Sequence, residues 1–247
     1  MPSFAVILPA AGQSSRFGGA EKKPFLPLEG KAIWQRSAEL FWGRPDVNRV
    51  YIVVPPEDCE FFTGRYAGIC IYRNVSIVKG GSERFESVAN ALAEIPEGVR
   101  FVAVHDAVRP LVTTKQIDDV FAGAIRYGAA MLAAPVADTL KRVEGPTHRI
   151  TETVPRAGLW AAQTPQVFRR DWLVDAYARR GGVSAAITDD AQLVEAVGHA
   201  VHVVPSDRQN FKITTRSDFA LAEWVLTSRA AALEPSAAGA FDDDASA

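Results

Sequence analysis

The chain has very few cysteines: Cys59 and Cys70 are the only two among 247 residues. Two thiols are too few for a disulfide framework or a structural zinc site. No apolar run approaches the roughly 18 residues that a membrane span needs, and the first apolar block, residues 4–8, stops at Pro9 without a basic segment before it. We therefore expect a cytoplasmic protein without a membrane partner.

The sequence also lacks an excess of either charge. Lys and Arg number 27, Asp and Glu number 29, and the formal net charge is −2. A protein that binds nucleic acid is usually strongly basic, with its cations clustered, so no nucleic-acid partner is expected. An anionic ligand would have to be held by a few placed cations rather than by the field of the whole molecule.

Apolar residues make up 48% of the chain, which excludes disorder over most of its length. Short apolar runs alternate with segments of helical periodicity. Strands are expected at residues 4–8, 50–54, 75–78, 101–104, 130–134 and 201–204. Helices are expected around residues 33–41, 85–95 and 117–125, the last beginning near Thr113 and Thr114 and ending at Gly128. This alternation predicts an α/β fold with a mostly parallel sheet flanked by helices.

Ligands of such sheets bind beyond the carboxyl ends of the strands, which directs attention to the loops after residues 8, 78 and 104. The first of these loops is rich in small residues and contains the cations Arg16 and Lys23. Its backbone N–H groups could form an anion-binding nest. Two familiar nucleotide-binding patterns are excluded, because Ser14 replaces the second glycine of a Rossmann fingerprint and Phe17 the second glycine of a P-loop.

Two segments depart from the alternation. Residues 138–156 are polar and threonine-rich around Gly145 and Pro146, which predicts a hairpin without an apolar face. A two-stranded hairpin alone is marginal in water, so this arm, about residues 137–157, is expected to pack on a second subunit. Residues 230–247 are rich in Ala, Ser, Gly and Asp and are expected to form a disordered tail after a single domain of residues 1–229.

Several motifs together resemble one known family. Pro9-Ala10-Ala11-Gly12, Arg16 and the Lys23-Pro24-Phe25-Leu26 segment resemble the signature loop of nucleotidyltransferases that join a nucleoside triphosphate to a phosphorylated sugar or polyol. The motifs that narrow the family are Gly80-Gly81-Ser82-Glu83-Arg84 with Ser87, His105-Asp106-Ala107-Val108-Arg109-Pro110, Ala134-Pro135-Val136-Ala137-Asp138-Thr139-Leu140-Lys141, Arg156 with Gly158-Leu159-Trp160, Thr164-Pro165-Gln166, Thr188-Asp189-Asp190 and Asn210-Phe211-Lys212-Ile213-Thr214. In this order and spacing, over roughly residues 4–228, they resemble the 2-C-methyl-D-erythritol 4-phosphate cytidylyltransferase family. Ser14 and Ser82 depart from the pattern, which often has Gly and an acidic residue there.

The resemblance implies a Rossmann-like sheet of the nucleotide-diphospho-sugar transferase type, with a protruding β-arm that joins two subunits into a homodimer. It implies transfer of a cytidylyl group from CTP to 2-C-methyl-D-erythritol 4-phosphate, with release of pyrophosphate, in the non-mevalonate isoprenoid pathway. It also implies Mg²⁺ bound mainly through the phosphates of CTP, with no dedicated protein site and Asp106 as the best protein ligand.

The roles implied for single residues fall into three groups. Arg16 and Lys23 would stabilise the transition state, and Arg156 and Lys212 would position the incoming phosphate. Nucleotide binding would fall to Ala10, Ala11, Gly12, Gly81, Ser82, Ser87, Asp106 and Ala107. Acceptor binding would fall to Asp106, Arg109, Thr139, Thr164 and Thr188.

Two alternatives stay open at this point. A cytidylyltransferase acting on ribitol 5-phosphate would share the loop and the fold. A nucleotide-binding module without catalysis would also share the fold, but it would be expected to lose Arg16, Lys23 or Lys212, and all three are present.

Overall fold

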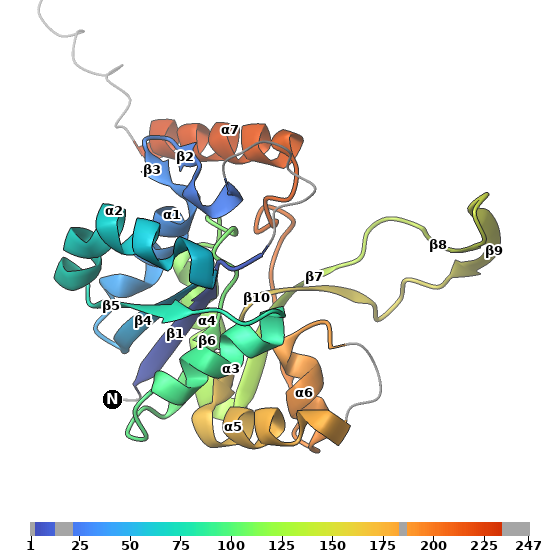
Figure 1. Ribbon diagram of the computed structural model, residues 1–247. Coiled ribbons are helices and arrows are strands. Elements are labelled where there is room, and N and C mark those ends of the chain that lie inside the picture. The colour runs from blue at the N-terminus through green and yellow to red at the C-terminus, as the bar shows by residue number, and fades with distance from the viewer. Residues whose placement is uncertain (1–2, 13–21, 183–186, 234–247) are drawn as a thin grey trace, which may run out of the picture.

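A seven-stranded sheet forms the centre of the computed structural model, which describes residues 3–12, 22–182 and 187–233 (Figure 1). Its strands are β1 (Phe4–Pro9), β4 (Val47–Val54), β5 (Val75–Lys79), β6 (Phe101–Val104), β7 (Ala129–Pro135), β10 (Trp160–Arg169) and β11 (His202–Pro205). They lie in the order β11-β7-β10-β6-β1-β4-β5, and every pairing is parallel except the two that β10 makes. The predicted α/β class and mostly parallel sheet are confirmed.

Helices cover both faces of this sheet. The first face carries α1 (Ile33–Trp42), α2 (Cys59–Tyr72) and α4 (Thr114–Tyr127), and the second carries α3 (Arg84–Glu94), α5 (Arg170–Ala178) and α6 (Asp190–Ala196). Along β1, the side chains of Phe4, Val6 and Leu8 pack toward the first set and those of Ala5 and Ile7 toward the second. Burial on both faces explains why the parallel strands appear in the sequence as continuous apolar runs.

Outside the arm, the other elements are short, apart from the C-terminal helix. They are η1 (Lys23–Phe25), β2 (Pro27–Leu28), β3 (Lys31–Ala32), η2 (Pro56–Asp58), η3 (Arg180–Gly182) and α7 (Arg216–Leu233). Helix α7 buries Ala222 and Val225 against Leu28, Leu111 and other apolar residues of the loop after β6 and the β2–β3 hairpin. It continues to Leu233, four residues beyond the expected end of the domain, and residues 234–247 lie outside the described part of the chain.

Helix α4 has the ends that the sequence predicts. The side chain of Thr113 accepts a hydrogen bond from Gln116 N, and Gln116 Oε1 accepts one from Thr113 N, which completes a capping box. Gly128 ends the helix with a φ of 89°, a conformation that favours glycine.

The predicted hairpin is present as an arm that projects from the body of the protein (Figure 1). Its strands are β8 (Leu140–Glu144) and β9 (Arg149–Val154), paired antiparallel, and nearly all of their residues are exposed. The exposed residues of the arm include the apolar Val143 and Ile150. Among the described residues, no helix is both long enough and apolar enough to cross a bilayer.

Candidate active site

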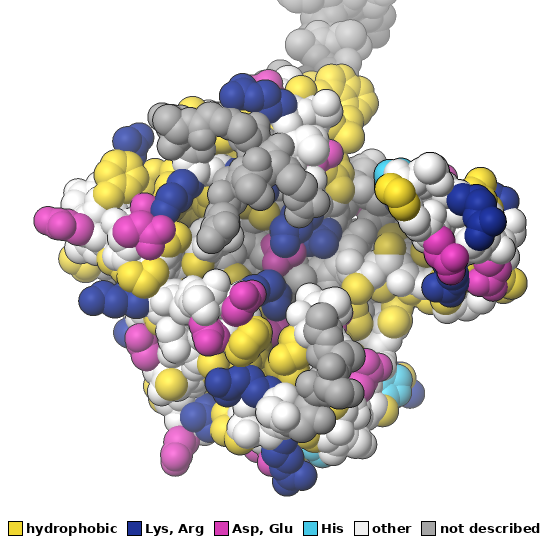
Figure 2. All heavy atoms as spheres, turned by 45° about the vertical axis from the view of Figure 1, so that its right-hand side comes forward, with side chains coloured by type: hydrophobic (Ala, Val, Ile, Leu, Met, Phe, Trp, Pro, Cys, Tyr) yellow, Lys and Arg dark blue, Asp and Glu magenta, His cyan; other side chains and the backbone are white. Residues whose placement is uncertain are grey.

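A cavity of about 420 Å³ opens at the carboxyl ends of the parallel strands. Three loops predicted from the sequence line it: the loop after β1, the loop between β5 and α3, and the loop after β6. Its described lining residues are Pro9, Ala10, Ala11, Gly12, Lys23, Pro24, Gly81, Ser82, Glu83, Arg84, Ser87, Asp106, Val108 and Lys212. Figure 2 shows basic and acidic side chains together in a hollow between the body and the arm. The volume lies in the range of a small-molecule site.

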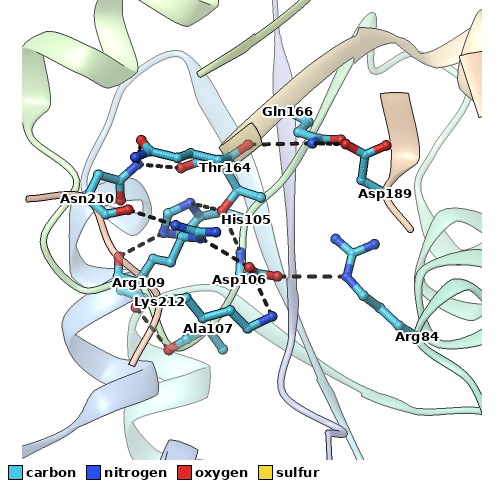
Figure 3. Close-up of polar contacts among 12 residues, drawn as sticks. Arg84, His105, Asp106, Ala107, Arg109, Thr164, Gln166, Asp189, Asn210 and Lys212 are labelled. Atoms are coloured by element: carbon cyan, nitrogen blue, oxygen red, sulfur yellow. Dashed lines mark hydrogen bonds and ion pairs between the residues drawn. The ribbon is translucent and has the colours of Figure 1, made fainter. Parts of the chain in front are cut away.

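Asp106 is the charged centre of this cavity, and three cations surround its carboxylate (Figure 3). Arg109 Nε lies 3.1 Å and Lys212 Nζ 3.2 Å from Oδ2, whereas Arg84 Nε lies 3.7 Å from Oδ1. Burial by itself would raise the pKa of Asp106, but Lys212, Arg84 and Arg109 outweigh it and hold that pKa well below its usual range. The carboxylate is therefore ionised at neutral pH, and the cations leave a net positive charge around it.

A buried hydrogen-bond network supports Asp106 from behind. His105 Nε2 donates to the carbonyl of Arg109 at 3.1 Å, and its Nδ1 accepts from the hydroxyl of Thr164 at 3.1 Å. The hydroxyl oxygen of Thr164 in turn accepts from Asp106 N at 3.0 Å. Burial lowers the pKa of His105 to about 4, so the ring is neutral near pH 7. Both ring nitrogens are used, which leaves His105 a structural support rather than a proton-transfer group.

Glu86 shapes the loop between β5 and α3. Its Oε2 accepts hydrogen bonds from Ser82 N at 2.8 Å, the Ser82 hydroxyl at 2.7 Å and Glu83 N at 3.2 Å. The hydroxyl oxygen of Ser87 accepts from Gly81 N at 3.1 Å. A Cβ at Gly81 would overlap the Cβ of Glu86, so only glycine fits this path of the backbone. The loop is thereby fixed against the cavity, and the Ser82 hydroxyl adds a bond to Glu86.

The structure brings most of the predicted site residues together. Ala10, Ala11, Gly12, Lys23, Gly81, Ser82, Ser87, Asp106 and Lys212 all line the cavity. Ala107, Arg109 and Thr164 lie directly behind it: Ala107 is fully buried, and the other two contact Asp106. Arg16 lies outside the described residues.

Three predicted residues lie apart from the cavity of their own chain. Thr139 lies just before β8 and Arg156 lies just after β9, and both are exposed. The guanidinium of Arg156 donates a hydrogen bond to the carbonyl of Ala137. Thr188 is exposed ahead of α6 and bonds Gln192 Oε1 at 2.8 Å through its backbone N–H. None of the three is among the described lining residues.

Sequence reasoning assigned no role to several residues that build the site. They include Arg84, Glu86, His105 and Asn210. Each is held in position by hydrogen bonds, either to residues distant in the chain or within a loop. A signal for Arg84 was available, since a cation three residues after a glycine pair, at the start of a helix, is well placed to face an anion. Asn210 gave no such signal, although it is fully buried and its Nδ2 donates to the carbonyl of Thr164 at 2.9 Å.

The described lining residues of the cavity do not form a metal site by themselves. Among the described residues, no group of three or more His, Cys, Asp or Glu side chains could hold a metal ion. Asp106 is the central carboxylate, but Arg84, Arg109 and Lys212 already engage its two oxygens. A divalent ion would therefore need most of its ligands from a bound substrate.

A cationic cavity beyond the strand ends of a mostly parallel sheet, without a P-loop, defines an α/β protein that handles phosphorylated ligands. The model of the family described as 2-C-methyl-D-erythritol 4-phosphate cytidylyltransferase matches residues 4–228. A protein of that name from Rhodopirellula baltica is 42% identical over 235 residues, which cover 91% of this chain and 95% of the relative. The chain belongs to the 2-C-methyl-D-erythritol 4-phosphate cytidylyltransferase family.

Further relatives agree in sequence and in structure. A protein of the same name from Salinibacter ruber is 41% identical over 220 residues, covering 89% of this chain and 91% of the relative. The crystal structure of the protein of that name from Thermus thermophilus superposes with a TM-score of 0.73 at 33% identity. The superposition covers 90% of this chain and 98% of that structure.

Proposed function

We propose that the chain transfers the cytidylyl group of CTP to 2-C-methyl-D-erythritol 4-phosphate, giving 4-diphosphocytidyl-2-C-methyl-D-erythritol and pyrophosphate. Family membership supports the reaction, and one observation of the site carries it. Lys23 and Lys212, from opposite ends of the chain, line the same cavity together with Asp106 and the loop from Gly81. Such an arrangement suits the approach of two polyanions.

The reaction needs little acid–base help from the protein. An oxygen of the acceptor phosphate attacks the α-phosphorus of CTP, a new P–O bond forms, and the bond to the departing pyrophosphate breaks. A phosphate monoester has its second pKa near ~6, so the nucleophile is largely ionised at pH 7. This agrees with the neutral His105, whose two ring nitrogens are already bonded.

Cations supply the main catalytic effect in this proposal. Lys23, with Arg16, would stabilise the charge that develops on the triphosphate, because preorganised donors act where negative charge grows. Lys212, with Arg156, would hold the acceptor phosphate. Lys212 pairs with Asp106 at 3.2 Å and is about 39% exposed, so it can turn toward a phosphate in the cavity.

We propose that Mg²⁺ arrives as part of the nucleotide substrate, since the cavity has no carboxylate cluster among its described residues. The ion would bridge phosphate oxygens of CTP and reduce the charge that the acceptor phosphate meets.

The arm supports a proposal for the assembly. It exposes Val143 and Ile150 and carries Arg156 and Thr139 at its ends, away from the cavity of its own chain. We propose a homodimer in which each arm reaches the cavity of the partner. Two-fold symmetry would then give two equivalent shared sites.

We also propose that the enzyme acts in the cytoplasm. Cys59 and Cys70 are both free thiols, and burial raises the pKa of the Cys70 thiol to about 11. Unpaired, unreactive thiols suit a reducing compartment.

The test is a panel of acceptors with CTP, read as release of pyrophosphate. We expect rapid release with 2-C-methyl-D-erythritol 4-phosphate and slow release with ribitol 5-phosphate. The reverse order would favour the ribitol phosphate enzyme, and nucleotide binding without release would favour a non-catalytic module.

A further inference from the structure

Asp190 is a buried acidic residue behind the cavity wall. It is the first residue of α6, and its side chain is 1% exposed. Arg84 Nη2 lies 2.9 Å from Asp190 Oδ2, and the hydroxyl of Tyr177, on α5, donates to Oδ1 at 2.5 Å. Both carboxylate oxygens therefore have partners, which fixes the orientation of Asp190.

Arg84 connects this buried carboxylate to the cavity. It is the first residue of α3, and its guanidinium lies between Asp190 and Asp106. Figure 3 shows Arg84 approaching Asp106 from the side opposite to Arg109 and Lys212. Arg84 contacts Oδ1 of Asp106, whereas Arg109 and Lys212 contact Oδ2.

The cations on the two sides of Asp106 would behave differently during the reaction. In the function proposed above, Lys212 turns to the phosphate of the acceptor and weakens its pair with Asp106. A buried carboxylate that loses a cation is left with an uncompensated charge, which is strongly unfavourable. Arg84 cannot follow the phosphate in the same way, because Asp190 holds it.

We propose that Arg84 is a positioning residue, anchored by Asp190 and Tyr177, that keeps Asp106 ionised and oriented while Lys212 engages the acceptor phosphate. The proposal rests on the function proposed above and adds a support for it that reaches from α5 and α6 to the reacting groups.

Asp190→Asn tests this directly. The substitution keeps the size of the side chain but removes the charge that anchors Arg84, and Asp190 does not line the cavity. At saturating CTP we expect kcat/KM for the acceptor to fall about tenfold, a usual effect of losing a group that orients a site residue. The KM for CTP should rise less, because Asp106 is only one of several residues that are expected to bind the nucleotide. An equal fall for both substrates would indicate a merely structural role and overturn the proposal.

Two further comparisons separate positioning from loss of fold. Arg84→Lys should retain more activity than Arg84→Gln, because it keeps a cation beside Asp106. The double variant Arg84→Gln/Asp190→Asn should be no worse than Arg84→Gln alone, since Asp190 acts through Arg84. Additive losses would overturn the proposal.

Tyr177→Phe is a milder variant in case Asp190→Asn does not fold. It removes the hydroxyl that bonds Asp190 and should lower kcat/KM for the acceptor about threefold, less than loss of the whole anchor. Arg44→Gln is the matched control, because Arg44 also pairs with two aspartates, Asp46 at 2.9 Å and Asp118 at 2.8 Å, but does not line the cavity. It should leave the kinetics unchanged.

The outcomes distinguish this inference from the function on which it rests. A wild-type protein that releases no pyrophosphate with any acceptor would overturn both. An active wild type with Asp190→Asn and Tyr177→Phe at wild-type kcat/KM would overturn only the inference.

Discussion

Lys22 and Lys23 are adjacent cations with different surroundings. Lys22 pairs with Glu57 at 2.9 Å and Asp58 at 2.7 Å, whereas Lys23 lines the cavity. We predict that Lys23→Ala lowers turnover by about two to three orders of magnitude, because it removes a cation from the place where negative charge develops. Lys22→Ala should keep turnover near that of the wild type, because Lys22 pairs with Glu57 and Asp58 and is not among the described residues that line the cavity. Pyrophosphate release measures both.

Stability separates a catalytic effect from a folding effect in this pair of variants. Both substitutions should change the free energy of unfolding by no more than about 1 kcal/mol, as for other residues near the surface. Denaturant titration of the two proteins checks this. If the two variants had similar turnover, Lys23 would have no part in the mechanism.

His105 gives the protein a pH dependence of stability with a definite sign. Its pKa is about 4 in the folded state against an ordinary value of 6.5, because burial disfavours the charged ring. Between these values the unfolded chain binds a proton that the folded chain does not. The free energy of unfolding should therefore fall as the pH drops from 6.5 toward 4, by at most about 3 kcal/mol from this residue.

Denaturant titrations at several pH values test the assignment to His105. In His105→Asn, the loss of stability between pH 6.5 and 4.5 should be smaller than in the wild type. The contribution of Asp106 lies lower, since its pKa is depressed below the ordinary 3.8 and its stabilisation is lost only as the pH falls below that value. An unchanged slope in the variant would assign the effect to other groups.

At the scale of an element, the turn from β5 into α3 depends on the absence of a side chain at Gly81. A Cβ there would overlap Glu86 and lie 2.8 Å from Glu86 Oε2. We predict that Gly81→Ala displaces this loop and raises the KM for CTP about tenfold, in line with other groups that support a site. Steady-state kinetics with varied CTP measures the change.

The control for this prediction is Gly68→Ala, within α2. A Cβ at Gly68 would meet nothing within 4 Å, and alanine is the better helix former by about 0.5–1 kcal/mol. This variant should be slightly more stable than the wild type with unchanged kinetics. An unaltered KM in Gly81→Ala would mean that the loop adapts without cost to the nucleotide.

Strand β10 shows what the sequence pattern could not predict. The parallel strands were predicted because burial on both faces makes them continuous apolar runs. In β10 the residues Gln163, Thr164 and Gln166 are buried, and the pairing with β7 shifts register around Pro165. Proline donates no ladder hydrogen bond, so it argues against an interior strand in the sequence.

The partners that make β10 stable are distant in the chain. Thr164 bonds His105 and Asp106 N, Gln166 accepts from Ala191 N at 3.0 Å, and Gln163 bonds Asn210. No local pattern shows that these polar groups will be satisfied. Helix α2 was missed for a different reason, since its apolar residues occupy both its buried and its exposed sides.

For the site, the sequence predicted the loops better than their supports. The cavity lies at the predicted strand ends, and most of its described lining residues were named from the family motifs. The link from Arg84 to Asp190 was not predictable, because the two residues are far apart in the chain and meet only where the fold places the starts of α3 and α6 close together.

At the scale of the whole molecule, the arm is the feature that has the least support from its own chain. Strands β8 and β9 pair only with each other, and their residues are almost all exposed. Leu159 and Trp160, at the base of the arm, are 39% and 42% exposed. A hairpin of this kind gains little stability from its own contacts, which favours a partner subunit as its support.

Complementation between two inactive variants tests the shared site. In a homodimer whose arm completes the partner's cavity, Lys23 of one subunit works with Arg156 of the other. Lys23→Ala and Arg156→Ala should each be inactive alone.

When they are mixed and subunits exchange, each heterodimer has one site with both defects and one with neither. With about half of the dimers mixed, activity should reach roughly a quarter of the wild type. An arm that served its own cavity would leave every site of the mixture defective, so a mixture that stays inactive after proven exchange would contradict the proposal.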